Sequence, residues 1–370
     1  MQESSARSII RAIFAPIPVL AVLTLAAGGI PLVPGAPAIA IVVADVGVRA
    51  IGAVLAAMLA HDIAHWLAAR LLGFRAVSAT IGPVVFVATR RGAHVRLVQS
   101  WRELRGEMVL EPRVEQRANS RWALVAAAGP AASLALGIAA LPVAPVVAVA
   151  SLVQFAFSAL PFGVRGEPSD GGRLLLLAAG GAAADRWCAM QRVAAAQFSG
   201  TRPRAWPDAW THDATALRDG TCAEALGCIA AFRRAVDGCA YDRASGLLDR
   251  ALALRSELPH AARCTLLADA AYFEARIHDD AERARGWLDE AETLRPACPV
   301  AERRAAAAVL IASGDVAAGA AAAREALAHV ARIEREEWRT LPMESDWLRE
   351  MIARAECAVV LPAEILAAAT

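Results

Sequence analysis

Two histidines four residues apart, His61 and His65, lie near the end of a long apolar stretch. In an α-helix, residues i and i+4 share one face, so both imidazoles can bind the same metal ion. Far downstream, Asp170 follows another apolar segment and offers a carboxylate oxygen as a third ligand. Two histidines and one carboxylate, with a fourth position left to water, form the ligand set of a catalytic zinc site. These residue types and their spacing therefore predict a hydrolytic zinc centre.

Each part of this pattern also has a simpler interpretation. A His-x-x-x-His pair arises often by chance, and most such pairs are structural. Asp170 lies in a Ser-Asp-Gly-Gly sequence, where it could cap a helix by accepting hydrogen bonds from free backbone N–H groups. The capping interpretation leaves the two polar rings unexplained, although such rings need partners in an apolar segment. A metal ion accounts for all three side chains together.

The composition indicates a membrane half followed by a water-soluble half. Of the 370 residues, 57% are hydrophobic, and the excess lies before about residue 180. Soluble domains are roughly 45–50% apolar. The formal net charge of +1 argues against electrostatic binding of nucleic acid. All seven cysteines lie between Cys188 and Cys357 without C-x-x-C spacing, which indicates free thiols and a cytosolic C-terminal half.

The fold class that we predict is an all-α membrane protein with four transmembrane helices, since a spanning helix takes about 20 residues. Between the second and third helices, residues 74–121 contain short β-like runs and nine arginines. The positive-inside rule places this small β-like, cytosolic or re-entrant loop in the cytosol, together with both chain ends. In this topology the histidine pair and Asp170 lie at similar depth. The predicted spans are residues 12–34, 38–72, 122–140 and 146–162.

The C-terminal half reads as a soluble α-helical domain with alanine-rich, amphipathic helices. Three similar stretches begin at Tyr241, Asp280 and Gly314, at intervals of about 34–40 residues. This pattern is typical of a degenerate tetratricopeptide repeat, and alanine-rich helical hairpins without repeat ancestry are the alternative. Both predict stacked helix pairs whose concave face binds a protein partner. The predicted domains are an N-terminal anchor helix (1–37), a membrane core (38–180) and a cytosolic helical repeat-like domain (181–370).

Three short motifs of the membrane core resemble those of one known family. They are His61-Asp-Ile-Ala-His65, Ala128-Gly-Pro-Ala-Ala-Ser133, and Ser158-Ala-Leu-Pro161 leading into Ser169-Asp-Gly-Gly-Arg173. Their order and spacing resemble the HExxH, GPxxN and N-x-x-P…DG patterns of site-2 proteases, which are intramembrane zinc metalloproteases. The resemblance covers roughly residues 40–180. It implies that His61, His65 and Asp170 bind Zn²⁺ and that the Gly129-Pro130 helix packs against the site.

Three positions depart from the family pattern: Asp62 replaces the glutamate, and Ser133 and Ser158 replace the two asparagines. The glutamate is the general base that takes a proton from the attacking water. Asp62 can do the same chemistry, but its shorter side chain withdraws the carboxylate by roughly 1 Å, which can cost on the order of 10²-fold in rate. The asparagine changes remove amide donors that could position substrate backbone or a developing oxyanion. Serine hydroxyls can partly substitute for them.

The function that these features predict is hydrolysis of a peptide bond in or near the transmembrane segment of a membrane-protein substrate, with Asp62 as catalytic base. An exposed β edge around residues 77–87 would hold the substrate by strand addition. We expect an integral protein of a bacterial inner or cell membrane that contacts the lipid bilayer and no nucleic acid. Two alternatives remain: a catalytically impaired zinc-binding relative, and a membrane-anchored helical-repeat adaptor.

Overall fold

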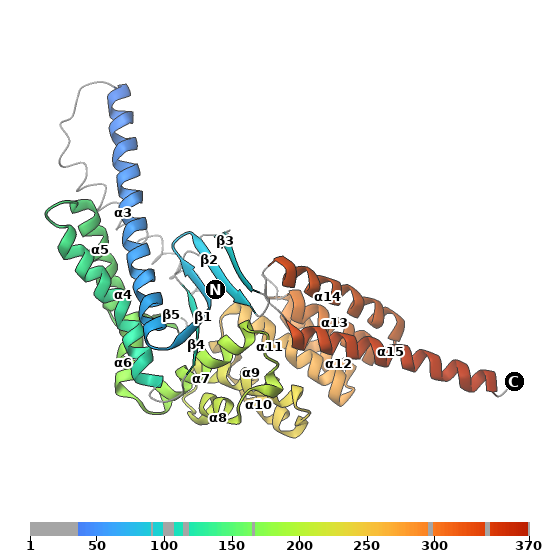
Figure 1. The fold of residues 1–370 in the computed structure, drawn as a ribbon. Helices are drawn as coiled ribbons and strands as arrows, with labels where there is room; N and C mark the ends of the chain where they lie inside the picture. Colours follow the sequence, from blue (N-terminus) through green and yellow to red (C-terminus); the bar gives the residue numbers. More distant parts are fainter. Residues whose placement is uncertain are drawn as a thin grey trace. The chain divides into compact units, whose positions relative to one another are not determined.

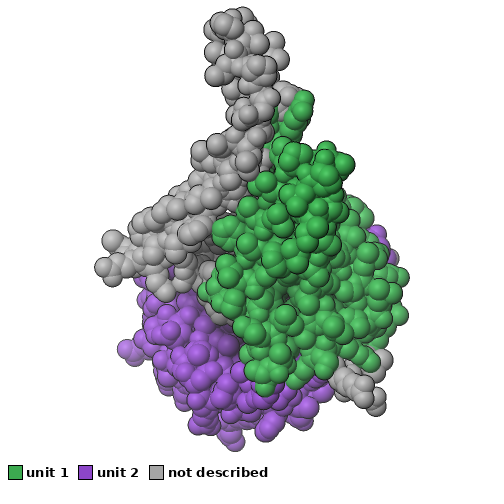
Figure 2. All heavy atoms as spheres, turned by 90° about the vertical axis from the view of Figure 1, so that its left-hand side faces the viewer, with its two compact units in different colours: residues 1–86, 95–179 green, residues 87–94, 180–370 purple. Residues whose placement is uncertain are grey.

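The computed structural model describes residues 36–89, 92–98, 107–113, 118–164, 167–294, 299–336 and 341–368. The predicted first span, residues 12–34, lies outside this part of the chain. The chain divides into two compact units (Figure 2): residues 1–86 with 95–179, and residues 87–94 with 180–370. The predicted border between the membrane core and the helical domain, 180/181, is next to the division at 179/180.

Four helices form most of the first unit. Helices α3, α4 and α5 pack against one another (Figure 1), and α6 contacts α4. α3 ends where Gly73 takes a positive φ of +81°, a conformation that glycine adopts without steric cost. α5 begins with a proline, whose missing N–H costs nothing at a helix start. The bounds are α3 (Ala36–Leu71), α4 (Ala118–Ala140), α5 (Pro145–Ala159) and α6 (Asp170–Ala179).

Two helices of the described chain, rather than four, are long and apolar enough to cross a membrane. They cover Val46–Leu71, within the second predicted span, and Asn119–Ala140, which begins three residues before the third predicted span. The fourth predicted span is the shorter apolar helix α5, which ends three residues earlier than predicted. The reason is local: Leu160 precedes Pro161, and the proline ring disfavours helical backbone in the residue before it, which here has ψ 130°.

Large apolar side chains are exposed almost wholly on the first unit. Of the exposed large hydrophobic residues that the structure describes, Tyr241 is the one outside it. On α3 successive members lie three or four residues apart, with one interval of eight, and so form a broad stripe along the helix. The residues of this stripe are Val48, Ile51, Leu55, Ile63, Leu67 and Leu71. Water is a poor environment for such a surface.

The predicted β-like loop is a real sheet, so the all-α description is too narrow. Its four strands are β1 (Phe74–Ile81), β2 (Val84–Thr89), β3 (Gly92–Leu97) and β4 (Met108–Pro112). They lie in the order β3-β2-β1-β4, with β4 antiparallel to β1. The predicted substrate-binding edge at residues 77–87 is therefore wrong, because these residues lie on the two inner strands. Among the described residues, the edges are β3 and β4.

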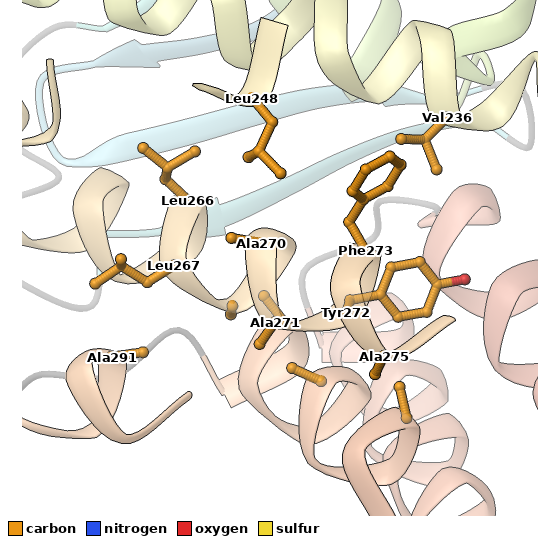
Figure 3. Close-up of a cluster of buried hydrophobic side chains, with 14 of the residues drawn as sticks. Val236, Leu248, Leu266, Leu267, Ala270, Ala271, Tyr272, Phe273, Ala275 and Ala291 are labelled. Carbon is orange, nitrogen blue, oxygen red and sulfur yellow. The ribbon is translucent and has the colours of Figure 1, made fainter. Parts of the chain in front are cut away.

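The second unit is helical. The three similar sequence stretches form α10, α12 and α14, and each packs against the helix before it as the second member of a pair. Leu248, Leu266, Leu267 and Phe273 lie in the buried core of these pairs (Figure 3). The helices are α7 (Gly181–Phe198), α8 (Asp208–Ala216), α9 (Cys222–Asp237), α10 (Tyr241–Ala253), α11 (His260–Phe273), α12 (Ala281–Glu292), α13 (Pro299–Ala312), α14 (Val316–Glu336) and α15 (Pro342–Ala368).

A buried ion cluster joins α11, α13 and α15 within this unit. The guanidinium of Arg304, which is fully buried, donates to Glu344 at 2.6 and 2.5 Å and also to Asp269. Its carbon Cζ lies 4.7 Å from the ring centre of Tyr272 and 5.0 Å from that of Trp347. Each charge is thus compensated in a place that water cannot reach. Removal of the Arg304 cation would leave the buried carboxylates of Asp269 and Glu344 without its compensating charge.

We predict that Arg304→Met destabilises the second unit by about 3–5 kcal/mol, because it breaks a buried ion cluster. Urea unfolding of the full chain, followed by tryptophan fluorescence, measures the change. Arg303→Met is the matched control, since the partly exposed pair Arg303–Glu325 lies on the surface and should contribute less than about 1 kcal/mol. Equal destabilisation by the two variants would contradict the assignment.

Candidate metal centre

The side chains of His61, His65 and Asp170 meet at one point. The two Nε2 atoms are 3.1 Å apart, and Asp170 Oδ2 lies 3.2 Å from Nε2 of His61 and 3.3 Å from Nε2 of His65. Ligands about 2.0–2.1 Å from a tetrahedral zinc ion lie roughly 3.3 Å from one another. The triangle therefore has the size of one face of such a site. Among the described residues, this is the one group of three metal-ligating side chains placed so closely.

Helix α3 supplies both histidines from one face. His61 and His65 are one turn apart, and their ring centres are separated by 4.7 Å. The same helix buries Ala53, Ala57 and Ala69, while its apolar stripe is exposed. Small residues on the inner face let neighbouring helices approach, and the imidazoles are thereby held inside the unit rather than on its surface.

Helix α4 holds both rings through their Nδ1 atoms, opposite the two Nε2 atoms that converge with Asp170. His65 Nδ1 donates to the backbone carbonyl of Val125 at 2.7 Å, and His61 Nδ1 is 2.9 Å from the hydroxyl of Ser133. A carbonyl can only accept, so Nδ1 of His65 carries the hydrogen. A neutral ring then presents the lone pair of Nε2 to the centre. Outer partners of this kind orient metal-binding histidines and fix their tautomer.

Gly129 allows this close approach, because it lies on α4 midway between Val125 and Ser133. A Cβ atom at this position would lie 2.2 Å from Nε2 of His65 and 2.7 Å from Nε2 of His61. No side chain fits there without moving the ligands. Pro130 follows inside the helix and removes one helical hydrogen bond, which loosens the turn that faces the site. The resemblance implied that this Gly-Pro helix packs against the histidines, and the geometry agrees.

Asp170 begins α6 but does not cap it. Ser169 Oγ accepts the N–H of Gly172 at 3.1 Å and donates to the carbonyl of Leu160 at 2.6 Å. The cap is therefore provided by the preceding serine, and Asp170 Oδ2 is left to face the imidazoles. Burial opposes ionisation of this carboxyl, but hydrogens on the two facing Nε2 atoms, in whose place a bound ion would sit, outweigh burial and hold its pKa well below the ordinary range.

The neighbouring acidic residue, Asp62, is buried and tied to the sheet. Its Oδ2 accepts the backbone N–H of Gly82, in the turn between β1 and β2, at 3.1 Å. A Cβ at Gly82 would lie 2.9 Å from Leu59, so the turn packs directly on α3. Asp62 is thus adjacent to a ligand without being one. Ser158 takes no part: its hydroxyl donates to the carbonyl of Phe155 in its own helix, at 3.3 Å.

Sequence reasoning missed the contribution of α4 to the ligand geometry. It assigned Ser133 to the substrate or to a developing oxyanion, whereas the hydroxyl contacts the ring of His61. The carbonyl of Val125 was not considered. The sequence does contain a signal for this contact. Val125, Gly129 and Ser133 are spaced by four residues, as are the two histidines, so that one face of each helix can pack against the other in successive turns.

Comparison with protein-family models, curated proteins and solved structures finds no match to this chain. The residues and their geometry are therefore the basis for assigning a function.

We predict that Gly129→Ala abolishes metal binding, because the added methyl group occupies the space of both imidazoles. Elemental analysis of the purified full chain measures bound metal per chain. Gly52→Ala is the matched control, since a Cβ at Gly52, on α3, meets nothing within 4 Å. Metal content that is unchanged in Gly129→Ala would show that α4 does not shape the site.

Proposed function

We propose that this chain is an intramembrane zinc metalloprotease, which hydrolyses a peptide bond in or near the transmembrane segment of a membrane-protein substrate. The observation that carries the proposal is the convergence of His61, His65 and Asp170 within a unit of apolar helices. The three motifs that resemble those of site-2 proteases contain these three residues and also Gly129, which lies against both imidazoles. We therefore propose that the chain belongs to this family.

The apolar surface of the first unit supports a location in the bilayer. Helix α3 presents its apolar stripe outward, and α4 exposes Leu124 and Ile138, while the side chains of His61 and Asp62 are buried inside the unit. In lipid, polar side chains are tolerated where they face the interior of a helix bundle and have partners. We propose that α3 and α4 span the membrane and that the helical second unit is cytosolic and binds a protein partner.

Zinc fits the donor set. Two imidazole nitrogens and one carboxylate oxygen in tetrahedral spacing leave a fourth position for water, as in other hydrolytic zinc sites. A zinc ion held by these ligands supplies Lewis acidity, which activates water at neutral pH and polarises a peptide carbonyl. The chain itself contributes the fixed orientation of the two rings, through Val125 and Ser133, and the exclusion of bulk water by the surrounding helices.

Asp62 is the residue we propose as general base. It follows His61 directly and is buried next to the site. A carboxylate has two oxygens, so the bond from Gly82 to Oδ2 leaves Oδ1 to accept a proton and to return it to the leaving amine. The same bond also favours a second candidate function, an impaired zinc-binding relative in which Asp62 serves mainly to anchor the β1–β2 turn.

The substrate in this proposal is an unwound segment of a membrane helix. An extended chain can add to a free sheet edge by backbone hydrogen bonds. The edge strands of the described sheet are β3 and β4. On β3, Val95 and Leu97 are exposed and two residues apart, and so lie on the same face of the strand. We propose that the substrate segment binds at these edge strands.

Cleavage of a model single-span substrate by the purified protein tests the assignment of Asp62 as the general base. We predict that Asp62→Asn lowers the cleavage rate by about 10²-fold or more, the usual contribution of a general base. Asparagine keeps a carbonyl oxygen for the N–H of Gly82, so the turn is not released. Asp249→Asn, the same change at an exposed position of α10, is the control and should leave the rate unaltered.

The remaining outcomes separate the alternatives. Equal cleavage by Asp62→Asn and wild type would refute the base assignment. A wild-type chain that binds one zinc ion but does not cleave the substrate, together with an Asp62→Glu variant that does cleave it, would identify an impaired relative. A chain that binds no zinc would be a membrane-anchored helical adaptor.

A further inference from the structure

We propose that Ser133 is a positioning residue of the metal centre, which holds the ring of His61 so that Nε2 faces the ion. This inference rests on the metal site of the proposed function but not on proteolysis. It assigns Ser133 a role toward a ligand rather than toward a substrate.

The contact is buried and specific. Ser133 is fully buried on the face of α4 that packs against α3, and its Oγ lies 2.9 Å from Nδ1 of His61. His61 is itself 6% exposed. Water therefore has little access to replace the hydroxyl. Without it, the Nδ1–H of a metal-bound ring would be buried with no acceptor, which costs free energy unless the ring turns.

The two histidines differ in how they are held. His65 is oriented by the backbone carbonyl of Val125, which no substitution removes. His61 is oriented by one side chain. Ser133 is therefore the position at which the orientation of a ligand can be changed while all three ligands stay in place.

The size of the residue is also determined by the site. Ser133 follows Gly129 by one helical turn, at the level where α4 lies against the imidazoles. A hydroxyl on a single methylene reaches Nδ1 at hydrogen-bonding distance without a larger side chain between the helices. Asparagine would bring an amide group into a position that has no exposed surface, where added atoms force packing to shift.

The test is the affinity of the full-length protein for Co²⁺, measured by visible absorption in detergent and in competition with Zn²⁺. We expect Ser133→Ala to weaken metal binding by about 10- to 100-fold, the usual effect of losing an outer partner of a metal-bound histidine. We also expect the absorption spectrum of saturated Co²⁺ to change, because the ring of His61 is no longer held.

Ser151→Ala is the matched control. Ser151 is also fully buried in the first unit, on α5, and its hydroxyl has no hydrogen-bond partner. This variant should bind Co²⁺ with wild-type affinity and spectrum. Equal affinities and spectra for Ser133→Ala and Ser151→Ala would overturn the proposal, whether both are normal or both are weakened by the same factor.

The result for Ser133 can be told apart from the result for proteolysis. A chain that binds Co²⁺ through His61, loses affinity in Ser133→Ala and cleaves no substrate would support the positioning role and refute the protease. A chain in which neither wild type nor His61→Ala binds Co²⁺ would refute both.

Discussion

The close contact of α3 and α4 at Gly129 is the constraint on which the rest of the structure depends. With only a hydrogen in place of a side chain, the backbone of α4 lies directly against the imidazoles of His61 and His65. The same approach brings Val125 and Ser133 within hydrogen-bonding distance of the two Nδ1 atoms. Helix packing and ligand orientation are therefore one interaction. A helix pair held further apart would still bury apolar surface, but it would leave both rings free to turn.

The charge arrangement at the centre follows from this contact. Once each Nδ1 is held by α4, the Nε2 lone pairs and an oxygen of Asp170 converge, and three acceptors so close together require a cation or protons between them. Ser169 caps α6 and so releases Asp170 from that task. The β1–β2 turn adds a third restraint, since Gly82 binds the carboxylate next to His61. Helix α4 thus orients the two imidazoles, the Ser169 cap leaves Asp170 free to face them, and the turn fixes Asp62.

The pairing of the two histidines was predictable from the sequence, because residues i and i+4 share a helix face wherever a helix forms. Asp170 lies more than 100 residues further on, and it was joined to this pair by residue type and predicted membrane depth rather than by local geometry. Contacts that depend on tertiary structure were not predictable in this way. Strand β4 is short, ends in Pro112 and pairs with residues of β1 that lie 29 to 38 positions earlier, so its presence and the burial of β1 inside the sheet were missed. The role of Ser133 was missed because it depends on how α4 is rotated against α3. The helix pairs of the second unit were anticipated because their alanine-rich repeats are also local patterns.

X-ray absorption at the zinc edge, on the full-length protein purified without added metal, tests the central claim most directly. The account predicts one zinc per chain, bound only by nitrogen and oxygen at about 2.0–2.1 Å, with two imidazoles in the first shell. One imidazole should disappear from the spectrum when His65 is replaced by alanine. A chain without zinc, or zinc bound by the sulfur of cysteines from the second unit, would contradict it.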